Sequence, residues 1–285
     1  MQTPLHCACQ GQYFTPLFVY TAPPAGEVRF QFSTFQPYRR TVRRCMLCGH
    51  CISEHAMDTS ALYSGDYVTS TYGEDGLRRA FARIMALDPA QSDNAGRVRR
   101  LLDFAASYLG TASCAERAPS ILDVGSGLCV FLCLMKAAGW QCTALDPDPR
   151  AVRHAREVVG VQAVCGDFLR VQNLGQFDVI TFNKVLEHVA DPVAMLAKSA
   201  EHLRQGGFVY VEVPDAEMAS REGPGREEFF IDHIHIFSPT SLALLVTRAG
   251  FTLRLLERLR EPSSKYTLRA FLTSSEDRSS ERRPS

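Results

Sequence analysis

The sequence of 285 residues lacks any long apolar run and any excess of charge of one sign. Its longest apolar stretch, residues 128–135, is too short to cross a bilayer, which takes about 18–20 residues. Lysine plus arginine and aspartate plus glutamate both number 31, so no overall positive field is available to hold a phosphate backbone. The first residues also lack the basic and apolar segments of a secretory signal. We therefore expect a cytoplasmic protein with no membrane partner, and nucleic acid is a disfavoured partner.

The composition is compatible with a folded core. Apolar residues make up 46% of the chain and charged residues 22%, which is typical of a globular protein. One ordinary α/β domain takes about 150–200 residues, so the chain has room for a second, smaller module. The basic runs at 39–44 and 97–100 are typical of solvated faces. No feature indicates a particular oligomeric state.

The ten cysteines do not indicate disulfides, because disulfide frameworks are rare in a reducing cytoplasm. Cys45 and Cys48 are separated by two residues and followed by a glycine, which is typical of a zinc knuckle. Cys7 and Cys9 supply two further ligands, so the sequence predicts a structural zinc ion at these four cysteines. Possible substitutes as ligands are Cys51, His50, His6 and His55. The alternative is a small irregular cap with free thiols.

Short β-rich runs alternate with helical runs from residue 120 onward, which is typical of βαβ units and a parallel sheet. The expected strands are 121–124, 142–145, 163–165, 177–182, 208–213, 252–257 and 266–272. The expected helices are 130–138, 149–158, 192–203 and 239–249, preceded by helices at 76–87 and from Ser92 onward. The last two strands follow one another without a helix between them. We therefore expect an α/β fold whose seven-stranded, mostly parallel, Rossmann-like sheet ends in an antiparallel hairpin.

Polar residues recur where the strands of this sheet should end. Gly125 and Gly127 form a turn directly after the first strand, and Asp146 ends the next strand about twenty residues later, where a carboxylate can accept hydrogen bonds from ribose hydroxyls. Asp167 and Asn183 end the third and fourth strands. Doubly wound sheets bind ligands at this edge. A nicotinamide dehydrogenase is the rival interpretation, but the third glycine of its fingerprint is missing.

In its motifs the sequence resembles the class I S-adenosylmethionine-dependent methyltransferases over residues 120–272. The matching stretches are LDVGSG at 122–127, LD at 145–146, GDF at 166–168, FDVI at 177–180, VLEHVADP at 185–192 and LRQGG at 203–207. The resemblance implies that Asp146 binds the ribose and that Asp167 holds the adenine amino group, with Phe168 beside the ring. The predicted cofactor-binding residues are Asp123, Gly125, Gly127, Asp146, Pro147, Asp167, Phe168 and Asn183. Cys129 departs from the family, which often has a third glycine there.

Two segments are candidates for the acceptor side of the site, 212–215 and 228–239. In the second, His233 and His235 alternate with isoleucines, so an extended segment would present both imidazoles on one face. Histidine titrates near neutrality and suits a general base, with Asp232 or Asp215 to orient it. We therefore predict His233, His235 and Asp232 as catalytic residues; a metal pair of the two histidines is the less favoured alternative. Glu187 and His188 could form a metal or acid–base pair, but the resemblance implies an element that leads into a helix.

The run from Asp232 onward is similar to small-molecule methyltransferases, including bacterial sugar C-methyltransferases that carry an N-terminal zinc-binding module. This resemblance implies a small-molecule acceptor, such as a nucleotide-linked sugar or another cell-envelope or natural-product intermediate. The alternatives are O- or N-methylation of another metabolite, a non-catalytic cofactor-binding scaffold, and a protein or nucleic-acid acceptor. The expected divisions are a zinc module at 1–58, a helical linker and acceptor cap at 59–118, the methyltransferase domain at 119–273 and a disordered tail at 274–285. In the cap, the tyrosines at 63, 67 and 72 either cover the acceptor or serve in packing.

Overall fold

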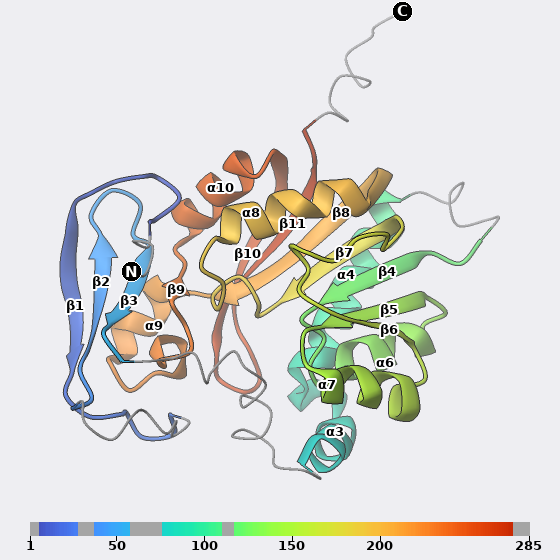
Figure 1. Ribbon diagram of the computed structural model, residues 1–285, viewed down its shortest axis with the longest axis horizontal. Coiled ribbons are helices and arrows are strands. Elements are labelled where there is room, and N and C mark those ends of the chain that lie inside the picture. Colours follow the sequence, from blue (N-terminus) through green and yellow to red (C-terminus); the bar gives the residue numbers. More distant parts are fainter. Residues whose placement is uncertain (1–5, 28–36, 58–75, 110–116, 276–285) are drawn as a thin grey trace, which may run out of the picture.

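The computed structural model describes residues 6–27, 37–57, 76–109 and 117–275, and in this part of the chain the strands form two sheets (Figure 1). The larger sheet has seven strands in the order β10-β11-β8-β7-β4-β5-β6. Its strands are β4 (Ser120–Val124), β5 (Gln141–Asp146), β6 (Gln162–Cys165), β7 (Phe177–Asn183), β8 (Leu203–Pro214), β10 (Phe251–Arg260) and β11 (Tyr266–Ser274). The smaller sheet has four strands in the order β1-β2-β3-β9.

The predicted α/β fold and its seven-stranded sheet are confirmed. Strands β4 to β8 pair in parallel, whereas β11 pairs antiparallel with both β8 and β10, so the sheet ends in the expected hairpin. Strands β4, β7 and β8 are buried along almost their whole length, as expected for parallel strands covered on both faces. Their carboxyl ends therefore meet at one edge of the sheet.

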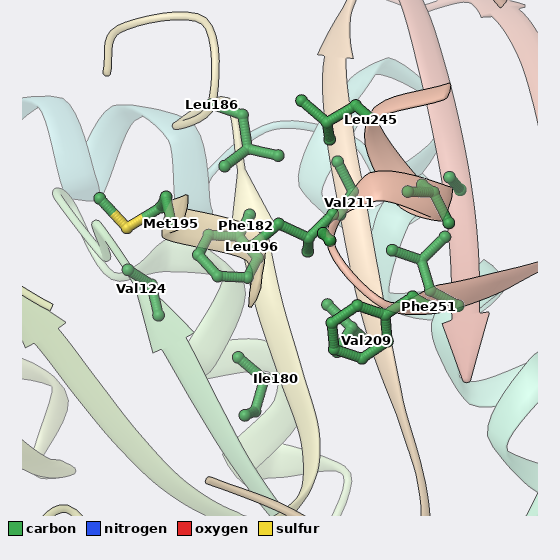
Figure 2. Close-up of a cluster of buried hydrophobic side chains, with 14 of the residues drawn as sticks. Val124, Ile180, Phe182, Leu186, Met195, Leu196, Val209, Val211, Leu245 and Phe251 are labelled. Atoms are coloured by element: carbon green, nitrogen blue, oxygen red, sulfur yellow. The ribbon is translucent and has the colours of Figure 1, made fainter. Parts of the chain in front are cut away.

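Helices cover both faces of the sheet (Figure 1). They are α3 (Gly76–Met85), α4 (Asp93–Tyr108), α6 (Val130–Ala137), α7 (Pro149–His154), α8 (Pro192–Lys198), α9 (Ala216–Glu222) and α10 (Pro239–Arg248), with short 3-10 turns at Pro89–Gln91, Ser199–His202 and Glu227–Phe229. Residues of α8 and α10 pack on one face in the core shown in Figure 2, around Phe182 and Val211. Residues of α4, α6 and α7 form a second core on the other face.

The helix ends follow the local sequence. Proline occupies the first turn of α7, α8 and α10, where its missing N–H costs nothing, and the side chains of Asp148, Asp191 and Ser238 cap these helices. Two predicted helices change type before they end: α7 continues as a π-helical turn at Ala155–Val159, and α8 continues as a 3-10 turn. The helix at α9 was not predicted from the sequence.

The smaller sheet was also not predicted. It consists of β1 (Phe14–Tyr20), β2 (Arg40–Cys45), β3 (Cys51–His55) and β9 (His235–Ile236), all paired antiparallel. Because β9 comes from the segment after α9, the small sheet pairs N-terminal strands with a segment that follows the large sheet's β8 in the sequence, and an isolated parallel bridge between Asp215 and Phe237 lies next to it. The division of the chain at residue 58 stays a prediction.

A buried ion pair between Arg40 and Glu27 connects the N-terminal sheet to residues 229–231, which precede β9. Arg40 lies 3.1 Å from Glu27, and both side chains are almost fully buried. Arg40 also donates to the carbonyl oxygen of Phe229, while Glu27 accepts the N–H of Ile231 at 2.8 Å. The pair therefore satisfies backbone groups of the segment that leads to the predicted catalytic residues.

Several sequence-based predictions fall outside the described residues. These are the tyrosines at 63, 67 and 72, and residues 276–285 of the expected disordered tail; Ser274, the first residue of that tail, instead ends β11. Among the residues that the structure describes, no helix is both long enough and apolar enough to cross a membrane. The cytoplasmic location stays a prediction.

Candidate functional site

The glycine turn after β4 has the backbone shape that the sequence predicted. Gly125 and Gly127 have φ angles of 70° and 47°, in the left-handed region that favours glycine. A Cβ atom at Gly125 would lie 2.8 Å from Cγ2 of Val185, whereas a Cβ atom at Gly127 would meet nothing within 4 Å. Cys129, where a third glycine was the expected family residue, has a φ angle of 59° in the same region. The turn is therefore tightly covered at Gly125 and open at Gly127.

Asp146 ties this turn to the neighbouring strand. Its two carboxylate oxygens accept the N–H groups of Gly127 at 2.8 Å and Asp148 at 2.9 Å. The residue is 8% exposed, and burial raises the pKa of its carboxyl group. Each carboxylate oxygen keeps a further lone pair, so Asp146 can accept two more hydrogen bonds from a ligand that lies over the turn.

Asp123 and Asn183 meet at the ends of β4 and β7. The Asp123 carboxylate accepts hydrogen bonds from the Asn183 amide at 2.8 Å and the Thr181 hydroxyl at 2.7 Å, and burial raises the pKa of Asp123 to about 6. The Asn183 amide oxygen and the Ser126 hydroxyl are buried without a hydrogen-bond partner. Because buried polar atoms are normally paired, these two atoms beside the glycine turn favour a polar ligand.

The third predicted strand end is more open. Asp167 accepts the N–H of Leu169 at 3.0 Å, and its side chain is about half exposed, so it can reach a ligand at the rim. Pro147 is exposed next to Asp146. The ring of Phe168, by contrast, is 2% exposed and packs against Phe182 in the core. The expected position of this ring beside an adenine does not agree with its burial.

In the first acceptor-side segment, residues 212–215, the carboxylates form ion pairs with arginines and do not act as a general base. Glu212 is fully buried between Arg97 at 2.5 Å and Arg269 at 3.0 Å. Burial alone would raise the pKa of Glu212, but the two guanidinium groups lower it to about 2. Asp215 caps α9 and forms a 2.7 Å ion pair with Arg258. Both carboxylates are therefore committed to neighbouring groups.

His235 does not face the site, which corrects the prediction that His233 and His235 share one accessible face. The chain turns at residues 231–234, and only His235–Ile236 is extended. His235 is 0% exposed, and its Nδ1 atom lies 3.0 Å from Nε2 of His50, whose Nδ1 atom in turn lies 3.2 Å from the Ser241 hydroxyl. Burial lowers the pKa of His235 to about 4. The residue therefore links β9 to His50 and, through His50, to α10.

His233 lies with Asp232 within this turn. Its Nδ1 atom is 2.9 Å from the carbonyl oxygen of Glu228, and its Nε2 atom is 4.0 Å from the Asp232 carboxylate. His188 stands against the His233 ring, with ring centroids 4.9 Å apart, and Glu187 is its chain neighbour. Glu187, His188 and His233 each offer a ligand atom within 4.8 Å of the others. From the sequence, Glu187 and His188 were a less favoured metal or acid–base pair, and an element leading into a helix was the favoured interpretation.

The four cysteines predicted as zinc ligands lie together. The Sγ atoms of Cys7 and Cys9 are 3.1 Å apart, those of Cys9 and Cys45 are 3.5 Å apart, and Cys48 completes a group within 4.8 Å. Four sulfurs around a zinc ion at about 2.3 Å would be almost 4 Å apart, so the group fits the ion after a small expansion. Burial would raise the pKa of Cys45, but the N–H groups of Cys48 and Leu47 lower it to about 7.

The predicted substitutes as zinc ligands lie elsewhere. His50 is engaged with His235 and Ser241, and Cys51 packs in the core between the small sheet and α9. His6 and His55 do not belong to the cysteine group. The structure therefore favours Cys7, Cys9, Cys45 and Cys48 over these substitutes as the metal-binding group.

Comparison with known proteins gives a family match. A family model described as "Methyltransferase domain" matches residues 90–256, more than half of the 285 residues. A ubiquinone biosynthesis O-methyltransferase of Albidiferax ferrireducens is 28% identical over 153 residues, which cover 51% of this chain and 52% of the relative. Another from Xanthomonas axonopodis pv. citri is 30% identical over 152 residues, 47% of this chain and 62% of the relative. The chain thus spans about half the length of the curated relatives it matches.

Solved structures match the fold. Magnesium protoporphyrin IX methyltransferase from Synechocystis PCC 6803 with bound SAH has a TM-score of 0.53 and 16% identity, and the match covers 76% of this chain and all of that one. Burkholderia thailandensis 1,6-didemethyltoxoflavin-N1-methyltransferase, bound to 1,6-didemethyltoxoflavin and S-adenosylhomocysteine, has a TM-score of 0.53 and 18% identity. That match covers 88% of this chain and 98% of the other. At these identities the likeness concerns the fold alone.

Proposed function

Because the chain belongs to the family of proteins with a methyltransferase domain, we propose that it transfers the methyl group of S-adenosylmethionine to a small-molecule acceptor. The observation that carries the proposal is the carboxyl edge of the large sheet. There the Asp146 carboxylate holds an open glycine turn, and two buried polar atoms without partners, on Ser126 and Asn183, lie beside it.

These residues suit the parts of that cofactor. Asp146 would accept hydrogen bonds from the two ribose hydroxyls, and the open backbone at Gly127 leaves room for the methionine part. The unpartnered Asn183 oxygen is an acceptor for an ammonium group, and the half-exposed Asp167 would accept from the adenine amino group. When bound, the cofactor supplies a sulfonium-activated methyl group.

The acceptor side is assigned to Asp232 and His233. In-line displacement requires that the acceptor be aligned and, when it is a hydroxyl, lose its proton. The Glu228 carbonyl oxygen fixes the His233 ring through Nδ1, so that Nε2 is the atom nearest to the Asp232 carboxylate. These two residues bind the acceptor and take part in removing its proton.

We assign a structural zinc ion to Cys7, Cys9, Cys45 and Cys48. A closed set of four sulfurs leaves no position for a substrate, so the ion would stabilise the N-terminal sheet and take no part in the reaction. The combination of such a module with the methyltransferase domain supports a nucleotide-linked sugar, or another cell-envelope or natural-product intermediate, as the acceptor. O- or N-methylation of another metabolite is the alternative, which the O-methyltransferase relatives favour.

The test is product analysis. The purified chain is incubated with S-adenosylmethionine labelled in its methyl group and with small-molecule extracts, and labelled products are identified by mass spectrometry. We expect transfer to a small molecule, with loss of transfer in Asp146→Asn. Cofactor binding without any labelled product would support the scaffold alternative. Label in protein or nucleic acid would instead overturn the small-molecule assignment.

A further inference from the structure

The group formed by Glu187, His188 and His233 contains a fully buried carboxylate. Glu187 is 0% exposed, and both of its carboxylate oxygens are buried without a hydrogen-bond partner among the residues that the structure describes. An isolated carboxylate in a protein interior is strongly unfavourable, so buried charges are usually paired or coordinate a metal ion. The charge of Lys184 acts on this carboxylate, but Lys184 donates its hydrogen bond to Thr267, so the Glu187 oxygens remain available to a positively charged ligand.

The two histidines are held as metal-ligating histidines usually are. The Nδ1 atom of His188 lies 2.8 Å from the carbonyl oxygen of Asp232, and the Nδ1 atom of His233 lies 2.9 Å from that of Glu228. A carbonyl oxygen only accepts, so each ring carries a proton on Nδ1, and Nε2 is the nitrogen that binds a metal ion when it is deprotonated. Such hydrogen bonds to backbone carbonyls fix ring orientation in metal sites and increase the basicity of the ligating nitrogen.

The backbone also joins the two segments that carry the group. The carbonyl oxygen of Glu187 accepts the N–H groups of Ile234 at 2.9 Å and His235 at 3.0 Å. The group lies near the cofactor edge, because Val185, two residues before Glu187, covers Gly125. Asp232 adds a second negative charge, 4.0 Å from a ring nitrogen of each histidine.

We propose that Glu187, His188 and His233 bind a divalent transition-metal ion beside the cofactor site. Two imidazoles and one carboxylate suit zinc, iron, cobalt or manganese, and three protein ligands leave positions open for an acceptor oxygen. Ligand atoms about 2.0–2.2 Å from one ion lie about 3–3.5 Å from one another. The ligand atoms of Glu187, His188 and His233 lie within 4.8 Å of one another, so rotation of these side chains would bring them to the distances that an ion requires.

The role of the ion rests on the proposed methyl transfer. An acceptor hydroxyl that binds to the ion would have a lower pKa and lose its proton to solvent near neutral pH. His233 then acts as a ligand and contributes to deprotonation through the metal. This role differs from that of the four-cysteine cluster, whose coordination is closed.

The test counts metal ions in the full chain with zinc retained in the cysteine cluster. Manganese(II) is titrated and followed by electron paramagnetic resonance, because a carboxylate–imidazole site accepts it more readily than thiolates do. We expect one bound ion per chain, and a loss of affinity of more than about 100-fold in Glu187→Gln and His233→Ala. His202→Ala is the matched control, since that buried histidine also contacts a backbone carbonyl through Nδ1 but lies outside the group.

A second readout separates metal binding from a merely structural role. Manganese should raise the thermal unfolding temperature of the native chain but not that of Glu187→Gln. The proposal is overturned if the native chain binds no ion beyond its zinc, or if both variants bind manganese with native affinity. S-adenosylmethionine binding is measured on the same samples. A chain that binds the cofactor without manganese contradicts only the metal site, whereas a chain that binds manganese without the cofactor contradicts the proposed function.

Discussion

Replacement of Asp146 by asparagine tests the cofactor site most directly. The carboxylate already accepts one backbone N–H on each oxygen, from Gly127 and Asp148. In Asp146→Asn one oxygen becomes an NH₂ group, which cannot accept a hydrogen bond from the N–H that it faces. The change therefore weakens both the glycine turn and the contact with a ribose.

The expected loss can be worked out from these contacts. A hydrogen bond to a charged group contributes about 1.5–3 kcal/mol, and the amide retains one of the two acceptor oxygens. Loss of one such bond to the ribose corresponds to a dissociation constant about 10- to 150-fold higher. The unpaired backbone N–H should cost about 1–3 kcal/mol of folding free energy. Isothermal titration calorimetry with S-adenosylmethionine measures the first effect, and thermal or urea unfolding measures the second.

Asp178→Asn is the control for stability. This carboxylate lies at the opposite end of β7, bound to the Ser120 backbone and to Arg117 and Arg204. Its replacement should lower stability at least as much as Asp146→Asn while leaving cofactor affinity within about twofold of native. The reasoning is refuted if folded Asp146→Asn binds S-adenosylmethionine with native affinity, or if both variants lose affinity equally.

Three further predictions concern stability. Burial would raise the pKa of Asp178, but hydrogen bonds from Arg117 and Ser120 lower it to about 2. The difference in unfolding free energy between the native chain and Asp178→Asn should therefore be about 2 kcal/mol above pH 4 and should disappear as the pH falls through 2. Urea unfolding at a series of pH values measures this difference. Cys48→Ser should abolish bound zinc and lower the unfolding temperature, as measured by elemental analysis and calorimetry, and unchanged metal content would contradict the four-cysteine site. Arg40→Met should cost about 3–5 kcal/mol because it leaves Glu27 buried without its partner, and adding Glu27→Gln should recover part of that loss in denaturant titrations.

The large sheet could be predicted because its signals are local. Strands β4, β5 and β7 are short buried runs, and prolines and capping residues mark where the helices begin. Asp123, Asp146 and Asn183 could be predicted as neighbours because carboxyl ends of parallel strands meet at one edge. The four cysteines also lie together, as their spacing indicated.

The small sheet could not be predicted because its fourth strand has only two residues and pairs with β3, far away in the sequence. The alternation of His233 and His235 indicated one shared face, but His233 lies in a turn and only His235 is in an extended strand. Phe168 shows a related limit, since a motif predicts where the backbone passes but not which way the ring points. Glu187 and His188 carried a signal, yet only the fold brings His233 to them.

His233, in the turn at residues 231–234, and His235, in β9, link the N-terminal module to the proposed acceptor side. Strand β3 begins three residues after Cys48, pairs with β9 through Ile52 and His235, and donates the N–H of Ser53 to the carbonyl oxygen of Ile234. The next link is Glu187, whose carbonyl oxygen accepts from Ile234 and His235. Each contact in this series is a backbone hydrogen bond, so a shift of β3 cannot be absorbed by side-chain rotation alone. A cluster that orders β3 therefore also orders the segment that carries His233, although it lies outside the reacting site.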